Sequence, residues 1–344
     1  MNPITLTVLI SSLALGTTIT LSSNHWLLAW IGLEINTLAV IPFLTLTPHP
    51  RAIEAATKYF LTQASASALI LFSASMSAWK TGEWAITSLS APFTITLPLA
   101  LMMKLGLAPM HFWLPEVIQG VPLMSGLILS TWQKVAPLSL LIQINHLIDL
   151  NILIALGLTS ALVGGWGGIN QTQLRKIMAF SSIGHLGWMI IILKFNPILT
   201  IFNFLLYSIM TAAMFLSLIS ISATKMTDIT SAWPKSPLLT TITMFTLLSL
   251  AGLPPLTGFA PKLFITLELV KQESILLSAV LMLASLLALF FYIRLTYLII
   301  LTIPPNISLS TAYWRSSYSP VPTAIFNTLA LLIFPMSTTL LLTL

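Results

Sequence analysis

Residues 238–267 read LLTTITMFTLLSLAGLPPLTGFAPKLFITL, an apolar run long enough to cross a membrane, with helix breakers at its centre. A helix needs about 20 apolar residues to span the hydrocarbon core. Proline removes a backbone donor and clashes with the preceding turn, so this run predicts a membrane helix that breaks near its middle. Irregular backbone at membrane depth is tolerated only where it is buried in protein or lines a water-filled space. The break is therefore a candidate functional site.

The rest of the chain has the same character. Of its 344 residues, 57% are hydrophobic and 6% are charged, whereas soluble domains carry about 25% charged residues. Its apolar runs are continuous and longer than barrel strands of about ten residues. We predict an all-α, polytopic integral membrane protein with about 11 transmembrane helices. The predicted spans are about 4–22, 25–46, 54–78, 85–110, 122–146, 150–168, 174–193, 198–222, 238–267, 275–301 and 322–343.

A second broken helix is predicted in the first half of the chain, at Gly106 and Pro109. The tetrapeptide Gly106-Leu-Ala-Pro109 has the same form as Gly258-Phe-Ala-Pro261, five spans later, beside Pro254 and Pro255. Corresponding breaks in two halves are typical of repeat transporters. We therefore predict one membrane domain, 1–344, built as an inverted repeat of five-helix units. The first repeat would cover about 4–146 and the second about 150–301, with an extra C-terminal helix at about 322–343.

Four charged residues lie deep inside predicted spans: Glu34, Lys104, Lys134 and Lys262. A charge at the bilayer centre costs about 3 kcal/mol on insertion scales, so such residues are by default candidates for ion or proton paths. Burial favours the neutral form of a lysine, and a nearby carboxylate favours the charged form. A glutamate–lysine pair that opens and closes would thus load and release a proton, and hydrated helix breaks would connect such groups.

Other interpretations of these charges remain open. Lys104 and Lys134 would reach the headgroups if their side chains snorkelled. Lys262 would cap carbonyl groups freed by the break, and Glu34 would form a structural hydrogen bond with a neighbouring helix. Snorkelling is the preferred interpretation for Lys58.

Two histidines are candidate proton relays because histidine titrates near neutral pH. His111 follows the first break, and His185 lies in the middle of a span. A packing role is equally consistent with either residue. The histidines have no metal-ligand spacing and the chain has no cysteine, so we expect no bound metal, haem or iron–sulfur cluster. The run Gly164-Gly-Trp-Gly-Gly168 lacks the Lys-Ser/Thr of a phosphate loop and predicts close helix packing instead.

Basic residues in the loops predict the orientation of the chain. Loops on the cytoplasm-like side of a membrane carry more Lys and Arg. With the N-terminus on that side, the loops there hold Arg51, Arg175, Lys176, Lys225, Lys235 and Arg315. The opposite loops hold Lys80, Lys194 and Lys271.

Several motifs resemble one family. The segments Leu107-Ala-Pro-Met-His-Phe-Trp-Leu-Pro115, Gln133-Lys-Val-Ala-Pro137, Ser181-Ser-Ile-Gly-His-Leu-Gly187 and Gly252-Leu-Pro-Pro-Leu-Thr-Gly-Phe259 are similar to segments of the antiporter-like subunits of respiratory complex I. The resemblance extends over the whole chain. Most members have fourteen helices, and this chain resembles the shortened animal mitochondrial form, which begins at the family's fourth helix.

The resemblance implies a function and a site. In the family, a glutamate on the fifth helix, lysines on the seventh and eighth, and a lysine or glutamate on the broken twelfth form a proton path. Glu34, Lys104, Lys134 and Lys262 match these positions. It implies proton translocation across the mitochondrial inner membrane, driven by electron transfer at a distance, with the N-terminus on the matrix side. NADH, FMN, iron–sulfur clusters and ubiquinone would be bound by other subunits. The expected partners are a small membrane subunit facing Glu34, another antiporter-like subunit, accessory subunits and lipids, and no nucleic acid.

Two other functions remain open. The chain would act alone as a cation/proton antiporter, since that class shares these motifs. Alternatively, it would be a structural spacer whose buried charges only fix helix pairing.

Overall fold

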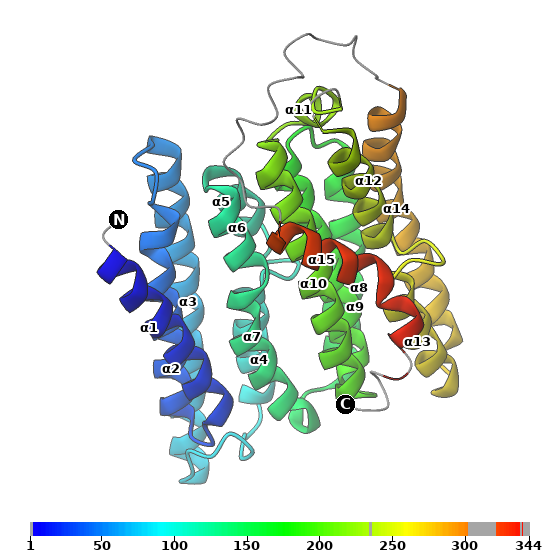
Figure 1. The fold of residues 1–344 in the computed structure, drawn as a ribbon. Coiled ribbons are helices and arrows are strands. Elements are labelled where there is room, and N and C mark those ends of the chain that lie inside the picture. Colours follow the sequence, from blue (N-terminus) through cyan, green and yellow to red (C-terminus); the bar gives the residue numbers. More distant parts are fainter. Residues whose placement is uncertain (1–2, 234–235, 302–320, 338, 340–344) are drawn as a thin grey trace. The chain divides into compact units, whose positions relative to one another are not determined.

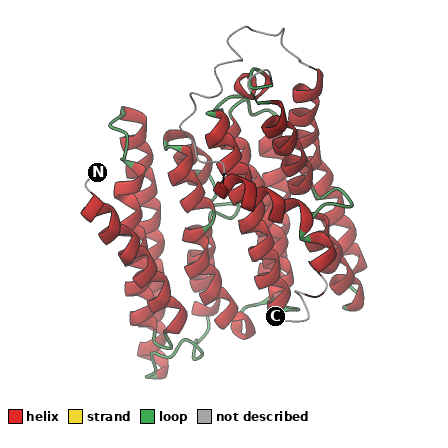
Figure 2. Cartoon of the chain, in the orientation of Figure 1, coloured by secondary structure: helices red, strands yellow, loops and turns green. Residues whose placement is uncertain are grey.

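Long membrane helices dominate the computed structural model, which describes residues 3–233, 236–301, 321–337 and 339. Among these residues there is no strand, and the chain is helical with short connections (Figure 2). Within the described part of the chain, seven helices are long and apolar enough to cross a membrane: α1 (Pro3–Ser22), α2 (Trp26–Leu44), α3 (Pro50–Thr81), α8 (Leu150–Ile169), α9 (Leu174–Leu193), α10 (Pro197–Ile221) and α14 (Ile275–Leu301). The predicted all-α membrane architecture is confirmed.

The remaining spans are made of shorter helices. They are α4 (Phe93–Leu105), α5 (Trp113–Gly120), α6 (Leu123–Ser130), α7 (Trp132–Gln143), α12 (Pro237–Ala251), α13 (Phe259–Lys271) and α15 (Val321–Leu332). Short α11 (Met226–Thr230) follows α10. Counting the pairs α4/α5, α6/α7 and α12/α13 as one span each, the described helices correspond one to one to the predicted spans.

Several predicted span boundaries were wrong, mainly at the broken helices. The first broken helix, predicted at 85–110, differs at both ends. Residues 85–92 are not part of a helix, and the second half of the broken helix extends to Gly120. The second broken helix extends to Lys271 instead of 267. The span predicted at 122–146 ends at Gln143 and is divided at Thr131, a break that was not predicted. Pro137 lies one turn further on and cannot donate to the carbonyl of Gln133, which weakens the helix there. Lys235, Arg315 and most of residues 338–343 lie outside the described residues.

The chain forms two compact units, residues 1–160 and 161–344, so the boundary falls inside α8. In unit 1, α3 packs against α2, α4 and α5, and α7 packs against α1, α2 and α4. In unit 2, α10 packs against α9, α12, α13 and α15, and Figure 1 shows α15 crossing the helices of that unit. The predicted repeat boundaries and the inversion of the repeats stay predictions.

Two local structures occur in both units. An isolated bridge pairs the residue before α2 with a residue after α3, His25 with Ala85, and another pairs the residue before α9 with one after α10, Gln173 with Lys225. In each unit, a left-handed residue ends the longer helix shortly before the bridge, Gly82 after α3 and Ser222 after α10. Because the left-handed residue and the bridge have the same spacing in both units, α3 can be aligned with α10 residue by residue.

The buried serine and threonine hydroxyls of α12 are satisfied by the backbone. On α12, Thr243, Thr246 and Ser249 are fully buried, and each donates to the carbonyl oxygen three residues earlier. This bonding leaves no free donor in an apolar environment, where an unsatisfied polar group is costly.

Candidate functional site

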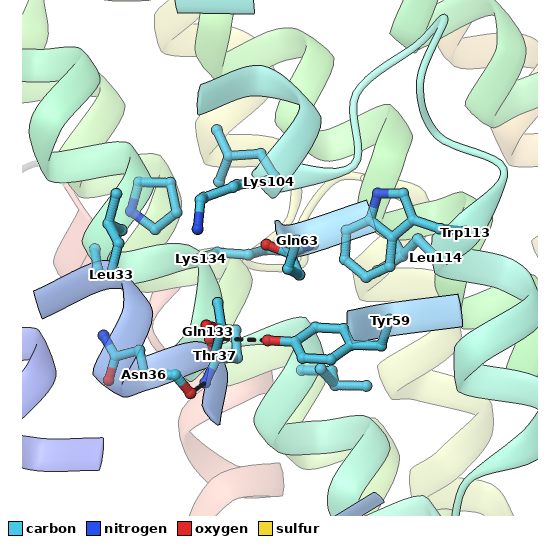
Figure 3. Close-up of a pocket in the computed structure, with 14 residues that line it drawn as sticks. Leu33, Asn36, Thr37, Tyr59, Gln63, Lys104, Trp113, Leu114, Gln133 and Lys134 are labelled. Atoms are coloured by element: carbon cyan, nitrogen blue, oxygen red, sulfur yellow. Dashed lines mark hydrogen bonds between the residues drawn. The ribbon is translucent and has the colours of Figure 1, made fainter. Parts of the chain in front are cut away.

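A small cavity lined in part by polar side chains lies inside unit 1. Its lining combines Lys104 and Lys134 with amide, hydroxyl and aromatic side chains from α2, α3, α4, α5 and α7 (Figure 3). The polar and aromatic residues are Asn36, Thr37, Tyr59, Gln63, Lys104, Trp113, Gln133 and Lys134. Two of the four predicted site residues are thus brought together at one cavity.

Lys104 lies in the last turn of α4, directly before the break. It is only 5% exposed, and its Nζ has no hydrogen-bond partner in the described part of the chain. Figure 3 shows its side chain pointing into the space that Gln63 and Lys134 also face. An isolated charge buried in this way is unfavourable unless water or a mobile partner compensates it. Snorkelling is excluded for Lys104 in this conformation.

Lys134 lies in the first turn of α7, just after the break at Thr131, and is 2% exposed. Gln133, the residue before Lys134, fixes the position of this turn through two hydrogen bonds. Gln133 donates from Nε2 to the carbonyl of Asn36 (3.3 Å) and accepts from the Tyr59 hydroxyl at Oε1 (3.5 Å). The backbone of α2 and a side chain of α3 therefore hold the end of α7 that carries the lysine.

Glu34 lies on α2 but does not line this cavity. It is half-buried, and its Oε2 atom is buried without a hydrogen-bond partner among the described residues. Its charge attracts the Lys104 ammonium, yet the two form no direct ion pair in the described structure. The structural hydrogen bond considered from the sequence is therefore not formed by Oε2.

The first break runs from Gly106 to Phe112 and contains Pro109 and His111. Gly106 ends α4 with φ of 77°, a left-handed conformation that favours glycine. Trp113, the first residue of α5, donates from Nε1 to the carbonyl of Met103 (3.1 Å) and so ties the two halves together. His111 is 7% exposed, and its Nδ1 lies 3.2 Å from the carbonyl oxygen of Pro109. It is not part of the cavity lining.

Unit 2 contains two neighbouring cavities that share three lining residues: His185, Trp188 and Lys262. One cavity extends between α8, α9 and α14, and the other extends toward α10. Lys262 donates from Nζ to the carbonyl oxygen of Ala251, the last residue of α12, at a distance of 2.6 Å. The capping interpretation of Lys262 is therefore correct for this conformation, although the same side chain also faces both cavities.

The second break has the same construction as the first, but in a different register from the one predicted. Gly252, with φ of 78°, ends α12 as Gly106 ends α4, and both breaks have the same length. Pro254 and Pro255 lie inside the second break, whereas Gly258 directly precedes α13 and Pro261 lies in its first turn. The structural counterpart of Gly106 is therefore Gly252 and not Gly258. Counting on from the two glycines, Pro115 matches Pro261 and Glu116 matches Lys262.

Sequence reasoning missed an ion-pair cluster on α3. Lys58 does not snorkel freely, because its Nζ lies 2.7 Å from both Glu54 and Glu116. The pairing of Lys58 with Glu116 joins α3 to α5. An acidic residue four positions before Lys58 signalled the local pair, but nothing in the sequence signalled the contact with α5. His25 and His49 also gained roles, because each caps a helix through Nδ1.

The glycine run at 164–168 packs closely against neighbouring helices, as predicted. A Cβ atom on Gly164 would lie 2.5 Å from the backbone nitrogen of Gly184 on α9. Gly168 faces Phe291 of α14 in the same way.

Comparison with known proteins identifies the family. Residues 23–288 match the family model of the transmembrane region of the NADH:quinone oxidoreductase/Mrp antiporter proteins. The chain belongs to this family. It is 69% identical to NADH-ubiquinone oxidoreductase chain 2 of Aquarana catesbeiana, over 99% of this chain and 100% of the relative. The corresponding protein of Xenopus laevis is 57% identical over 95% of each chain.

Two solved structures share the fold. A chain of respiratory complex I from Thermus thermophilus superposes with a TM-score of 0.83 and 26% identity, over 97% of this chain and 80% of that one. A chain of the Mrp complex from Dietzia sp. superposes with a TM-score of 0.84 at 18% identity, over 97% and 75% of the two chains. The fold is therefore common to a respiratory complex and an Mrp complex.

Proposed function

We propose that this chain is an antiporter-like, proton-translocating membrane subunit of NADH:ubiquinone oxidoreductase. The relatives with 69% and 57% identity are both chain 2 of that enzyme. The observation that carries the proposal is the cavity in unit 1, where two lysines that are 5% and 2% exposed face one space beside helix breaks. Such a cavity has the polar lining and the titratable groups that proton transfer inside a membrane requires.

In this mechanism the side chains of the chain hold and release protons, and the chain performs no redox chemistry. Glu34 exchanges a proton with Lys104, and Lys134 is the central relay of unit 1. In unit 2, Lys262 transfers protons to the opposite surface or to the next subunit. His185 shares both cavities with Lys262 and is the preferred relay there, whereas His111 is outside the unit 1 cavity and is the weaker candidate.

The assembly and location follow from the same proposal. NADH, FMN, iron–sulfur clusters and ubiquinone would bind other subunits, and electron transfer there would drive this one. A small membrane subunit would cover the half-buried Glu34, and another antiporter-like subunit would continue the path. The location would be the mitochondrial inner membrane, with the N-terminus in the matrix. The bridge between Gln173 and Lys225 supports a common side for the basic residues Arg175 and Lys225.

The test is Lys134→Ala in the assembled complex. We expect NADH:quinone turnover and proton pumping both to fall at least about tenfold, because a removed acid–base group typically costs 10²–10⁴-fold. Pumping is measured in proteoliposomes by a pH-sensitive dye, and assembly by native gel. Lys271→Ala is the control, since that side chain is 73% exposed. Normal pumping and turnover in assembled Lys134→Ala complex would contradict the proposal and leave the lysine a structural role.

One alternative is favoured by a specific observation. The fold is shared with a chain of an Mrp complex, so a stand-alone cation/proton antiporter is the second candidate. Purified chain in liposomes distinguishes the two functions. Cation-driven proton exchange by the chain alone supports the antiporter, and proton movement only in the NADH-oxidising complex supports the complex I subunit.

A further inference from the structure

Asn203 on α10 is a buried amide with an unusual environment. Its side chain is 2% exposed, and both its Oδ1 and Nδ2 atoms lack a hydrogen-bond partner among the residues that the structure describes. A buried polar group without a partner typically costs 1–3 kcal/mol. Such groups in native proteins are usually satisfied by ordered water or have a function.

The amide faces a cavity that Lys262 and His185 also line. The hydroxyl-bearing Tyr207 contributes a further polar side chain to the wall. A buried water needs room and two to four polar partners, and this cavity provides both. The amide can donate through Nδ2 and accept through Oδ1, so it can orient water in either direction.

The first unit has an amide at the matching position. Counting back from the left-handed caps Gly82 and Ser222, Gln63 on α3 corresponds to Asn203 on α10. Gln63 is 4% exposed and lines the cavity of Lys104 and Lys134. The two units therefore each place one buried amide at the same helix position, beside their buried lysine. Packing alone does not explain why both positions are polar.

We infer that Asn203 is a positioning residue that holds ordered water between His185 and Lys262, and that Gln63 has the same role in unit 1. The water would accept from Nδ2 or donate to Oδ1 and would hydrate the lysine when its ammonium leaves the Ala251 carbonyl. This inference rests on the proposed function, because the water matters only if Lys262 exchanges protons.

The experiment compares Asn203→Leu with Asn203→Gln in the assembled complex. Leucine has a similar volume and removes an amide that makes no hydrogen bond in the described structure, so the complex should assemble and its melting temperature should not fall. Proton pumping should fall about tenfold, which is less than the roughly 10²–10⁴-fold loss for removal of an acid–base group, because the amide only positions water. Glutamine should restore most of the pumping, because Gln63 shows that this side chain fits the matching position. Thr243→Val, a buried change on α12 outside the cavity lining, is the control.

Each outcome decides the inference. Normal pumping in Asn203→Leu overturns it, and so does a loss that glutamine fails to restore together with a lower melting temperature. Lys262→Ala is measured in parallel. If that variant loses pumping while Asn203→Leu does not, only the inference fails. If neither variant loses pumping, the proposed function of unit 2 fails.

Discussion

Lys104 is buried and Lys262 is half-buried. Both lie beside a helix break, but their ammonium groups have different neighbours. Lys262 donates a 2.6 Å hydrogen bond to the end of α12, whereas the Nζ of Lys104 has no partner in the described structure. A charged hydrogen bond contributes about 1.5–3 kcal/mol to stability, and a buried charge without one is destabilising. The two lysines should therefore respond differently to neutral replacement.

Lys262→Met and Lys104→Met test this difference. Both should reduce proton pumping, because both remove a titratable group. Only Lys262→Met should lower the free energy of unfolding, by about 1.5–3 kcal/mol, while Lys104→Met should leave it unchanged or higher. Thermal melting of the purified complex, followed by intrinsic fluorescence, measures the shift. Equal destabilisation by both substitutions would contradict the assignment of the cap to Lys262 alone.

Asp228 provides a pH-dependent contact at the end of α10. Partial burial opposes its ionisation, but hydrogen bonds from the backbone of Lys225 and Thr224 and from the Thr224 hydroxyl outweigh this and lower the pKa of Asp228. The carboxylate therefore stabilises the fold above its unfolded pKa of about 3.9. That stabilisation is lost as the pH falls through the lower pKa of the folded state.

Asp228→Asn should accordingly lower the melting temperature at pH 7 and at pH 5 by the same amount. Below about pH 3.9 the difference from the native protein should shrink. Differential scanning calorimetry of the detergent-solubilised complex gives both values. A difference that already disappears between pH 7 and pH 5 would show that another group carries the effect.

At the scale of elements, the two broken helices share one design. Each first half ends at a left-handed glycine, and a side chain from the second half donates to a carbonyl of the first: Trp113 to Met103, and Lys262 to Ala251. At both glycines the backbone lies close to the side chain that donates this hydrogen bond. A Cβ on Gly252 would lie 2.9 Å from the end of the Lys262 side chain, and one on Gly106 would lie 3.3 Å from Trp113.

Alanine substitutions at three glycines separate the cost of a left-handed backbone conformation from the cost of a steric clash at Cβ. Gly82 also has positive φ (77°) but has nothing near its Cβ position, so Gly82→Ala should cost only the conformational term of about 1–2 kcal/mol. Gly106→Ala should cost somewhat more, and Gly252→Ala should additionally displace Lys262 and reduce pumping. Pumping and melting temperature are measured for all three. Normal pumping in Gly252→Ala would show that the contact with Lys262 is not needed.

The sequence predicted the helices better than the breaks within them and the contacts between them. Uninterrupted apolar runs identified every long helix. The burial of Lys104 and Lys134 and the partial burial of Lys262 followed from their depth in these runs. The division at Thr131 was missed because Pro137, its main signal, lies a turn away and most helices with one proline stay continuous. The register of the second break was missed because two Gly-Xaa-Xaa-Pro motifs follow each other there, and only backbone conformation distinguishes Gly252 from Gly258. The pairing of Lys58 with Glu116 depends on tertiary packing.

For the whole molecule, the boundary between the two units lies within α8 and not in a loop. The connection before α8 passes through the exposed residues His146 and Asp149. Chain cuts at exposed connections are tolerated far better than cuts inside elements. A cut inside α8 would leave unpaired backbone groups in the membrane.

Two co-expressed fragments, 1–146 and 147–344, should therefore assemble and support pumping close to that of the intact chain. Fragments 1–160 and 161–344 should not. Native gels and proteoliposome pumping give the result. Failure of the first pair with success of the second would show that α8 is not one structural element, contrary to its continuous helix.

The hydrogen bond from Lys262 to Ala251 places an ammonium group at the C-terminal end of α12. Because peptide dipoles align along a helix, its C-terminal end carries a partial negative charge of about half an electron. Lys104 lies in the last turn of α4, and Lys262 contacts the end of α12. The Lys262 ammonium, which contacts that end, therefore has a partial counter-ion that belongs to the main chain. A carboxylate counter-ion can be lost by one mutation or neutralised by one proton, but a helix end can only be removed by unwinding it.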